Sequence, residues 1–202
     1  MGENDAGAGH RQAAARAREL LLESARVKQR VAAELAERIA EAGALLAEAF
    51  RCGRRALLFG NGGSAADAQH IAAEWTGRFR GERRPLPALA LTTNSSELTC
   101  LGNDYGFEKV FSRLLEAHGR EGDVAVALST SGLSPNVIEG VQVALERGLR
   151  VIGLLGKDGG KLATLVHLPL VVPSSDTQHI QEAHIAIGHV LCDLVDGALF
   201  SD

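Results

Sequence analysis

The chain has 202 residues and a formal net charge of −4 at pH 7, with 46% hydrophobic, 23% charged and 4% aromatic residues. This length suits one domain, or one domain with an added helical arm, and it is enough to bury a large core. The mild acidity argues against a protein that binds nucleic acid through a basic face, and the ordinary hydrophobicity excludes wholesale disorder. Because aromatic residues are so few, we expect an aliphatic core.

The cysteines and the N-terminus indicate where the protein works. Cys52, Cys100 and Cys192 lie far apart without CxxC spacing, which is typical of reduced thiols rather than of disulfides or a zinc knuckle. The first residues include acidic side chains where a signal peptide is basic, and no apolar core of a signal peptide follows. No run approaches the roughly 18 apolar residues of a membrane helix. We therefore predict a cytoplasmic protein with no membrane or nucleic-acid partner.

The N-terminal quarter of the chain reads as helical. Residues 1–9 are small or polar and are predicted to form a mobile tail. Over residues 10–52 apolar side chains recur every three to four positions, which predicts helices. Ser24 and Gly43 are weak points, so we expect two helices or one broken helix. An apolar stripe without a partner of its own favours oligomerisation through these helices, with packing on the domain as the alternative.

From residue 53 to 202, short apolar runs alternate with helical patterns. The runs that predict strands are Ala56–Phe59, Ala88–Thr92, Val124–Leu128, Val151–Leu155 and Leu168–Val172. The segments that predict helices are Ala65–Trp75, Glu108–His118, Asn136–Arg147 and Ile180–Leu199. This alternation predicts an α/β fold, a three-layer, flavodoxin-like sandwich in which helices flank a parallel five-stranded sheet. In such folds ligands bind beyond the carboxyl ends of the strands.

The first predicted strand leads into a glycine-rich turn, Gly60-Asn61-Gly62-Gly63-Ser64. Glycines allow a tight turn and a close approach to a ligand. Ser64 can cap the following helix, whose N-terminal amides favour an anion. The turn lacks the lysine of the GxxxxGK[ST] nucleotide loop and does not fit GxGxxG. A glycine turn without a ligand is the alternative.

The third predicted strand ends in a cluster of hydroxyls, Ser129-Thr130-Ser131-Gly132-Leu133-Ser134-Pro135-Asn136. Hydroxyls and free amides at a helix N-terminus can bind a phosphate monoester without a cation. The plain alternative is that Ser134 is only a helix cap followed by Pro135 at the first helical position. That alternative leaves the other hydroxyls unexplained, so we favour phosphate binding.

Two helices carry residues with the chemistry of a catalytic or metal site. His70 and Glu74 are four residues apart and share one helix face. Such a pair can bind a divalent metal or act as a base and its neighbour, although most such pairs are solvated surface partners. The last predicted helix is unusually polar, and its spacing alone does not say which histidine functions. We predict ordinary surface or loop positions for His118 and His167.

Several stretches from residue 53 onward carry a family resemblance, in order and with compatible spacing. They are Gly60–Ser64, Asp67–His70, Glu74–Phe79, Arg84–Ala88, Gly102–Phe107, Ser129–Gly132, Gly156–Gly160 and Ile180–His184. Together they resemble the sugar isomerase (SIS) domain family and, within it, the phosphoheptose isomerases. The resemblance implies an SIS domain over residues 53–202. It also implies conversion of D-sedoheptulose 7-phosphate to D-glycero-D-manno-heptose 7-phosphate through an enediol by acid/base catalysis, the first step of nucleotide-activated heptose biosynthesis.

The same resemblance implies roles for individual residues. Glu74 is the implied base and His189 its acid partner. The implied ligands of one divalent metal per subunit, often zinc, are His70, Glu74, Gln181 and His189. The implied substrate-binding residues are Asn61, Gly62, Gly63, Ser64, Glu74, Arg78, Asn103, Asp104, Ser129, Thr130, Ser131, Ser134 and Gln181. Leu133 departs from the family, which commonly has asparagine there, and this leaves the preference for the sugar end open.

The implied metal ligands also bear on assembly. Gln181 and His189 are eight residues apart on one predicted helix, so about 12 Å separates them along the axis. Two side chains that far apart reach one metal only with difficulty. We therefore predict that the site lies at a subunit interface and takes ligands from more than one chain. The resemblance implies a homotetramer, in agreement.

Two other functions remain open. A close relative in the SIS family is a non-catalytic scaffold for the bacterial replication initiator, and its tail resembles Cys192–Asp196 and Leu199–Phe200 here. That relative lacks the acidic and histidine positions that this chain keeps as Glu74 and His189, which favours an enzyme. The third possibility is an isomerase or binding domain for another sugar phosphate, such as a hexose or an amino sugar.

Overall fold

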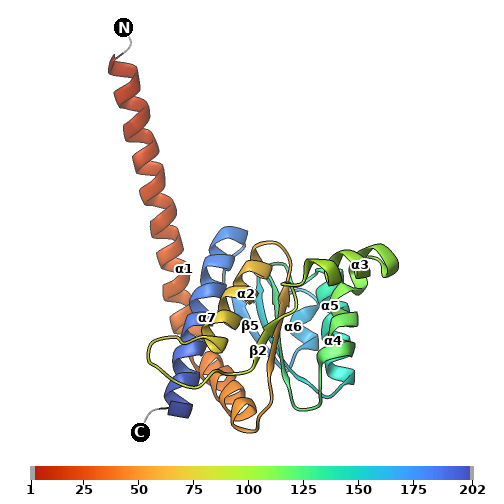
Figure 1. The fold of residues 1–202 in the computed structure, drawn as a ribbon. Helices are drawn as coiled ribbons and strands as arrows, with labels where there is room; N and C mark the ends of the chain where they lie inside the picture. Colours follow the sequence, from red (N-terminus) through yellow and green to blue (C-terminus); the bar gives the residue numbers. More distant parts are fainter. Residues whose placement is uncertain (1–2, 201–202) are drawn as a thin grey trace.

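The computed structural model describes residues 3–200, with side chains from residue 9 onward. Its centre is a parallel sheet of five strands in the order β2-β1-β3-β4-β5 (Figure 1). The strands are β1 (Ala56–Gly60), β2 (Ala88–Ala90), β3 (Val124–Ser129), β4 (Arg150–Gly156) and β5 (Leu168–Val172). The predicted α/β sandwich with five parallel strands is confirmed.

The helices follow the predicted alternation, with two additions. They are α1 (Glu3–Arg51), α2 (Gly63–Thr76), α3 (Ser95–Tyr105), α4 (Val110–His118, after the 3₁₀ turn η1, Phe107–Lys109), α5 (Pro135–Glu146), α6 (Leu162–Leu165) and α7 (Thr177–Phe200). The sequence did not indicate α3 or α6. None of the residues of α3 is fully buried. Leu98 and Leu101 pack against the core, but this apolar pattern is too short to predict a helix. Asn94 caps its first turn. The four residues of α6 are too few to show a period.

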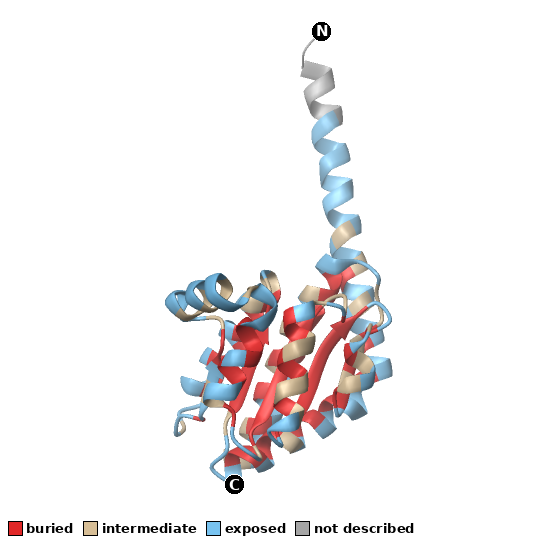
Figure 2. Ribbon diagram, turned by 90° about the vertical axis from the view of Figure 1, so that its right-hand side faces the viewer, coloured by how far each residue is buried: buried red, intermediate tan, exposed pale blue. Residues whose placement is uncertain are grey.

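Side chains alternate across the sheet and build a core on each face. Ala56 and Leu58 of β1 point into the larger core, which α1, α2 and α7 cover. Leu57 and Phe59 point into the opposite core, which α4, α5 and α6 cover. This alternation explains why the central strands are buried on both faces and read as continuous apolar runs (Figure 2).

The N-terminal segment forms one unbroken helix, α1, so the prediction of two helices or a broken helix is wrong. Both supposed weak points have a packing role. Ser24 is buried and its hydroxyl bonds Glu182 of α7. Gly43 faces Leu194, whose Cβ would lie 3.0 Å from a Cβ added at this glycine, so the absent side chain lets α7 pack closely. Residues 3–9 of the predicted tail belong to α1, and residues 1–2 lie outside the described part.

The two halves of α1 have different surroundings. Between Val31 and Phe50 its apolar residues belong to the larger core and pack against α7 and β5. The half before Glu23 projects from the body as an exposed arm (Figures 1 and 2), and Leu21 on it is 73% exposed. The core therefore includes part of the predicted 10–52 segment, while the arm remains free to contact another chain.

Helix α7 is long and apolar enough, by length and composition alone, to cross a membrane. Histidines and carboxylates interrupt its apolar residues, so the sequence contains no continuous apolar run of that length. In the structure Ile180, Ile187 and Leu191 of α7 are buried in the larger core. Contacts with α1, α2, β4 and β5 make α7 a core helix of this domain.

Candidate functional site

Two loops meet at the carboxyl edge of the sheet because β1 and β3 are neighbours, with Gly60 in register with Leu128. The loops are joined by two side-chain amides. Asn61 Nδ2 donates to Asn136 Oδ1 at 2.8 Å, and Asn136 Nδ2 donates to Asn61 Oδ1 at 2.9 Å. Asn136 belongs to the stretch that we expected to bind phosphate, but the sequence did not indicate this partnership. These two bonds connect the glycine-rich turn to the hydroxyl-rich loop.

The hydroxyl-rich loop is organised by its own serines. Ser129 Oγ lies 3.2 Å from Ser134 Oγ and accepts from the Gly132 amide at 3.1 Å. Ser131 Oγ accepts from the Leu133 amide at 3.2 Å. Ser134 precedes α5 as its cap residue, but its side chain makes no capping hydrogen bond. The alternative is therefore right in placing Ser134 at the cap and Pro135 at the first helical position, but the Ser134 hydroxyl faces Ser129 rather than the backbone of the helix.

A second glycine loop holds this one in place. Gly132 has a φ of 64°, and a Cβ there would lie 1.9 Å from the carbonyl oxygen of Gly159. Next to the loop lies a cavity of about 320 Å³ lined by Asn61, Phe107, Glu108, Ser134, Pro135 and Asn136. Ser134 of the hydroxyl-rich loop therefore lines a cavity that it shares with Asn61 of the glycine-rich turn.

The start of α2 is shaped by contact with α7. Gly62 is the cap residue with a φ of 54°, and Ser64 is buried inside the first turn, so our expectation that Ser64 caps the helix is wrong. A Cβ on Gly63 would lie 1.7 Å from Nε2 of Gln181. The amide of Gln181 therefore lies directly over the glycine-rich turn, and only glycine at position 63 leaves room for it.

Three of the predicted metal ligands come together between α2 and α7. His70 Nε2 lies 3.2 Å from Glu74 Oε1 and 3.3 Å from His189 Nε2. One ligand atom from each of the three lies within 4.8 Å of the others. The helical spacing places His70 and Glu74 on one face of α2, and the packing of α7 brings His189 to them. Phe79 stacks on the His189 ring at 5.8 Å between ring centroids.

This donor set suits a divalent metal such as zinc. Ligand atoms of a tetrahedral zinc site with bonds of about 2.0–2.1 Å are about 3.3 Å apart, close to the two separations between His70 and its neighbours. Two imidazoles and one carboxylate are also a known catalytic zinc set that leaves the fourth position open. The residues present therefore fit a metal.

Gln181 of the same chain does not join this cluster. It lies at Gly63, and His70 is seven residues further along α2, about 10 Å along the helix axis. A cavity of about 340 Å³ opens beside it, lined by Asp67, Gln178, Gln181, Glu182 and Ile185. The four predicted metal ligands thus divide into three and one within a single chain.

The remaining predicted substrate residues lie apart from the cluster. Asn103 and Asp104 are exposed on α3, hydrogen-bonded to each other at 2.8 Å. Helix α3 stands out from the body beside the carboxyl edge of the sheet (Figure 2). Arg78 is exposed and lies 4.0 Å from Glu82. Among residues 9–200 no hydrogen bond or ion pair joins these side chains to His70, Glu74 or His189.

Two residues near the cluster were not singled out from the sequence. Asp67, one turn before His70, is largely buried, and burial raises the pKa of its carboxyl to about 6. Arg83 is a buried cation that bonds the end of α2. Asp67 stands within a quoted motif, whereas Arg83 is one of several arginines in Arg78–Arg84, and only packing distinguishes it.

Comparisons with known proteins agree with the resemblance. The SIS domain family model matches residues 21–156. The chain is 59% identical over 167 residues to the phosphoheptose isomerase of Geobacter sulfurreducens, covering 83% of this chain and 88% of that one. It is 53% identical over 179 residues to that of Aquifex aeolicus, covering 89% and 94%. A solved phosphoheptose isomerase from Neisseria gonorrhoeae is similar with a TM-score of 0.86 and 47% identity, covering 90% of this chain and 97% of that one.

Proposed function

The chain belongs to the SIS-domain family and within it to the phosphoheptose isomerases, and we propose that its site isomerises D-sedoheptulose 7-phosphate to D-glycero-D-manno-heptose 7-phosphate. It is an aldose–ketose isomerase of heptose biosynthesis. The observation that carries the proposed mechanism is the contact of His70, Glu74 and His189 between α2 and α7.

Glu74 and His189 supply the proton transfers. Glu74 removes the proton on the carbon next to the carbonyl, which gives an enediol, and returns that proton to the neighbouring carbon. His189 moves the hydroxyl proton between the two oxygens. Glu74 contacts His70 through Oε1. Among the described residues no hydrogen bond or ion pair engages Oε2, so this oxygen is available for the carbon-bound proton.

His70, Glu74 and His189 would hold the metal, for which we propose zinc. When bound, the ion supplies a Lewis acid that polarises the substrate carbonyl. Phe79 covers one face of the His189 ring and restricts its orientation. These three side chains therefore combine the holding of a metal with the movement of protons.

The hydroxyl-rich loop binds the phosphate end of the substrate. Ser129, Thr130, Ser131 and Ser134 offer hydroxyls beside the N-terminus of α5. Amides and hydroxyls suffice to bind a phosphate locally, which is consistent with the net charge of −4. Ser64 lies beside the phosphate. The other substrate-binding residues are Asn61, Gly62 and Gly63 of the glycine-rich turn, with Arg78, Asn103, Asp104 and Gln181.

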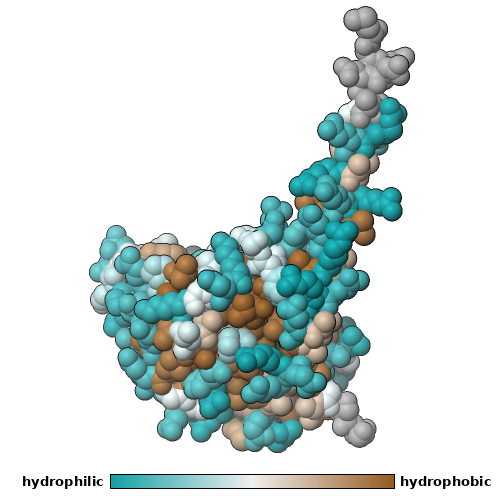
Figure 3. Space-filling model, turned by 180° about the vertical axis from the view of Figure 1, so that it is seen from behind, coloured by the Kyte–Doolittle hydropathy of each residue, from teal (hydrophilic) through white to brown (hydrophobic). Residues whose placement is uncertain are grey.

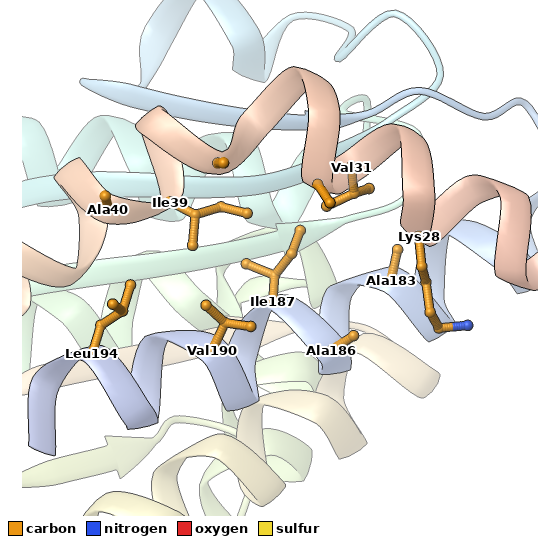
Figure 4. A pocket seen from close by; sticks show the side chains of 11 residues that line it. Lys28, Val31, Ile39, Ala40, Ala183, Ala186, Ile187, Val190 and Leu194 are labelled. Carbon is orange, nitrogen blue, oxygen red and sulfur yellow. The ribbon is translucent and has the colours of Figure 1, made fainter. Parts of the chain in front are cut away.

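We propose a homotetramer whose sites take residues from more than one chain. The division of Gln181 from the other three ligands supports a second chain at each site. An apolar groove of about 420 Å³ between α1 and α7 supports the assembly (Figure 4). Val190 and Leu194 reach its surface, and apolar side chains gather beside the base of the arm on the face that Figure 3 shows. We further propose a cytoplasmic location, without membrane or nucleic-acid partners.

Direct assay tests the function. The purified protein is expected to turn over sedoheptulose 7-phosphate, and Glu74→Gln is expected to lower kcat about 100- to 10,000-fold. Glu116→Gln, an exposed carboxylate on α4, is the matched control. Unchanged turnover in Glu74→Gln would disprove the assigned base. No turnover together with tight binding to the replication initiator would favour the scaffold, and turnover of another sugar phosphate alone would favour the third possibility.

A further inference from the structure

Arg83 is a buried cation at the C-terminal end of α2, the helix that carries His70 and Glu74. Its side chain is only 3% exposed. Nη2 donates to the carbonyl oxygen of Glu74 at 2.8 Å, and Nη1 donates to those of Trp75 at 2.8 Å and Gly77 at 2.9 Å. The last carbonyls of a helix have no partner within the helix, and α2 has no basic residue in its last turn. Arg83 gives the Glu74 carbonyl a donor, adds a second donor to the Trp75 carbonyl, which also accepts from the Leu86 amide at 2.9 Å, and supplies the missing charge.

The same guanidinium also bonds α7. Its Nε donates to Asp196 Oδ1 at 3.0 Å, and the Asp196 side chain is 18% exposed. Asp196 follows His189 by seven residues on α7, which is two turns along the same face of the helix. One side chain thus joins the backbone of Glu74 to the helix that carries His189.

The cluster depends on the spacing between these two helices. His70 and His189 come from different helices, and their Nε2 atoms are 3.3 Å apart. Near this contact the helices are already close, because a Cβ on Gly188 would lie 2.5 Å from Ile71 Cδ1. Gly188 and Ile71 give one fixed point, and Arg83 with Asp196 gives a second at the end of α2. Two fixed points determine both the distance and the angle between the helices.

We propose that Arg83 is a positioning residue: through its fork of bonds to Glu74, Trp75, Gly77 and Asp196 it holds Glu74 and His70 at the distance from His189 that metal binding and proton transfer need. This rests on the proposed function of the cluster. Partners that orient ligands typically affect metal affinity or activity about 10- to 100-fold.

A neighbouring ion pair provides a matched control. Arg80 lies 3.1 Å from Asp193 and also joins the segment after α2 to α7. Its side chains are 76% and 49% exposed, and among the described residues Arg80 donates to no helix carbonyl. Loss of this exposed pair removes a charge pair and the contact of Arg80 with the Phe79 ring, whose centroid lies 5.7 Å from the guanidinium carbon, but it leaves the end of α2 untouched.

The test compares Arg83→Gln with Arg80→Gln by titration with Co²⁺, whose absorption reports its coordination, and by steady-state kinetics. We expect Arg83→Gln to weaken Co²⁺ binding about 10- to 100-fold and to lower kcat similarly, with KM within about threefold because the phosphate loop is elsewhere. Arg80→Gln should resemble the wild type. Arg83→Lys should not restore Co²⁺ affinity, because one ammonium group cannot reach acceptors on both helices. Wild-type Co²⁺ affinity and kcat in folded Arg83→Gln, or full rescue by lysine, would overturn the proposal.

If Arg83→Gln does not fold, Co²⁺ binding to Asp196→Asn is compared with Co²⁺ binding to its control, Asp193→Asn. Asp196→Asn keeps the bonds to the α2 carbonyls and removes only the charge that joins Arg83 to α7. About tenfold weaker Co²⁺ binding than in Asp193→Asn supports the proposal, and equal binding overturns it. Failure of the wild type to bind Co²⁺ would count against the metal site itself, and kcat of the same variants would then test Arg83.

Discussion

Asn61 and Asn136 exchange two hydrogen bonds through their side-chain amides, at 2.8 Å and 2.9 Å, although 75 residues separate them in the chain. This pair joins the turn after β1 to the first turn of α5. Because Asn136 is only 3% exposed, the pair is shielded from competing water. It sets the separation between the residues proposed for the sugar and those proposed for the phosphate.

Asn136→Asp is expected to raise KM for the sugar phosphate about tenfold. A carboxylate accepts from Asn61 but cannot donate back, and its charge would repel the phosphate. One unsatisfied buried group should also lower the free energy of unfolding by about 1–3 kcal/mol. Gln142→Glu makes the same change on the same helix, away from the loop. Equal KM values in these two variants would contradict the proposed role of the pair.

Gly63→Ala is expected to lower kcat/KM about tenfold while leaving the fold intact. The added Cβ would meet the end of the Gln181 side chain at 1.7 Å, and this flexible side chain would rotate away from the turn. Alanine in a helix is favoured over glycine by up to about 1 kcal/mol, so the melting temperature should not fall. The control is Gly81→Ala, where no atom lies within 4 Å of the new Cβ, and it should behave as the wild type. A normal kcat/KM in Gly63→Ala would argue against a role for Gln181.

Removal of the metal should stop turnover, and Zn²⁺ should restore it. His70→Ala and His189→Ala should each weaken Zn²⁺ binding by at least about 100-fold, since even loss of an outer partner costs 10- to 100-fold. His10→Ala, on the exposed arm, is the control for loss of a histidine. Full activity after exhaustive chelation, with metal content checked by mass spectrometry, would show that no metal is needed.

The stability of the protein should fall as the pH drops below about 6.5, in part because of His184. Burial lowers the pKa of this histidine from 6.5 to about 4, and its Nε2 lies 2.9 Å from the Leu155 carbonyl oxygen. Between these values the unfolded chain binds a proton that the folded protein does not. The free energy of unfolding therefore falls by up to about 3 kcal/mol as the pH approaches 4.

Comparison with His184→Gln isolates this contribution. Asp67 titrates in the same range with the opposite sign, because burial raises its pKa from 3.8 to about 6 and the folded protein binds the extra proton. That term is present in both proteins and cancels in their difference. Urea titrations at pH 7 and pH 5 should show a smaller loss of stability in His184→Gln than in the wild type. Equal losses would mean that His184 does not contribute.

Ala36→Glu should dissociate the proposed assembly. Ala36 is exposed and lines the apolar groove between α1 and α7, and a carboxylate there would have to be desolvated by a partner chain. The control is Ala33→Glu, three residues away on the same helix and outside the groove. It replaces alanine by glutamate in the same helix and so makes the same change in helix propensity. Light scattering should find a smaller particle for Ala36→Glu only. Identical masses for the two variants would show that this groove is not the interface.

The sequence by itself determined the fold class and much of the chemistry. Alternating apolar runs and helical periods are local patterns, and they predicted the five parallel strands and their order of succession with helices. The i, i+4 spacing of His70 and Glu74 is also local, and the structure places them on one face of α2. Resemblance then identified His189 as the partner of this pair.

Tertiary structure alone decided which distant residues meet. Gly43 lies inside the unbroken helix α1 and packs against Leu194 of α7, a contact that helix propensity does not predict. Packing of α7 on α2 brings His189 to His70 and leaves Gln181 at Gly63. Burial likewise distinguishes Arg83 from the exposed arginines around it. The physical reason is that local patterns record the interactions of near neighbours, whereas site geometry depends on helices that meet only after the chain has folded.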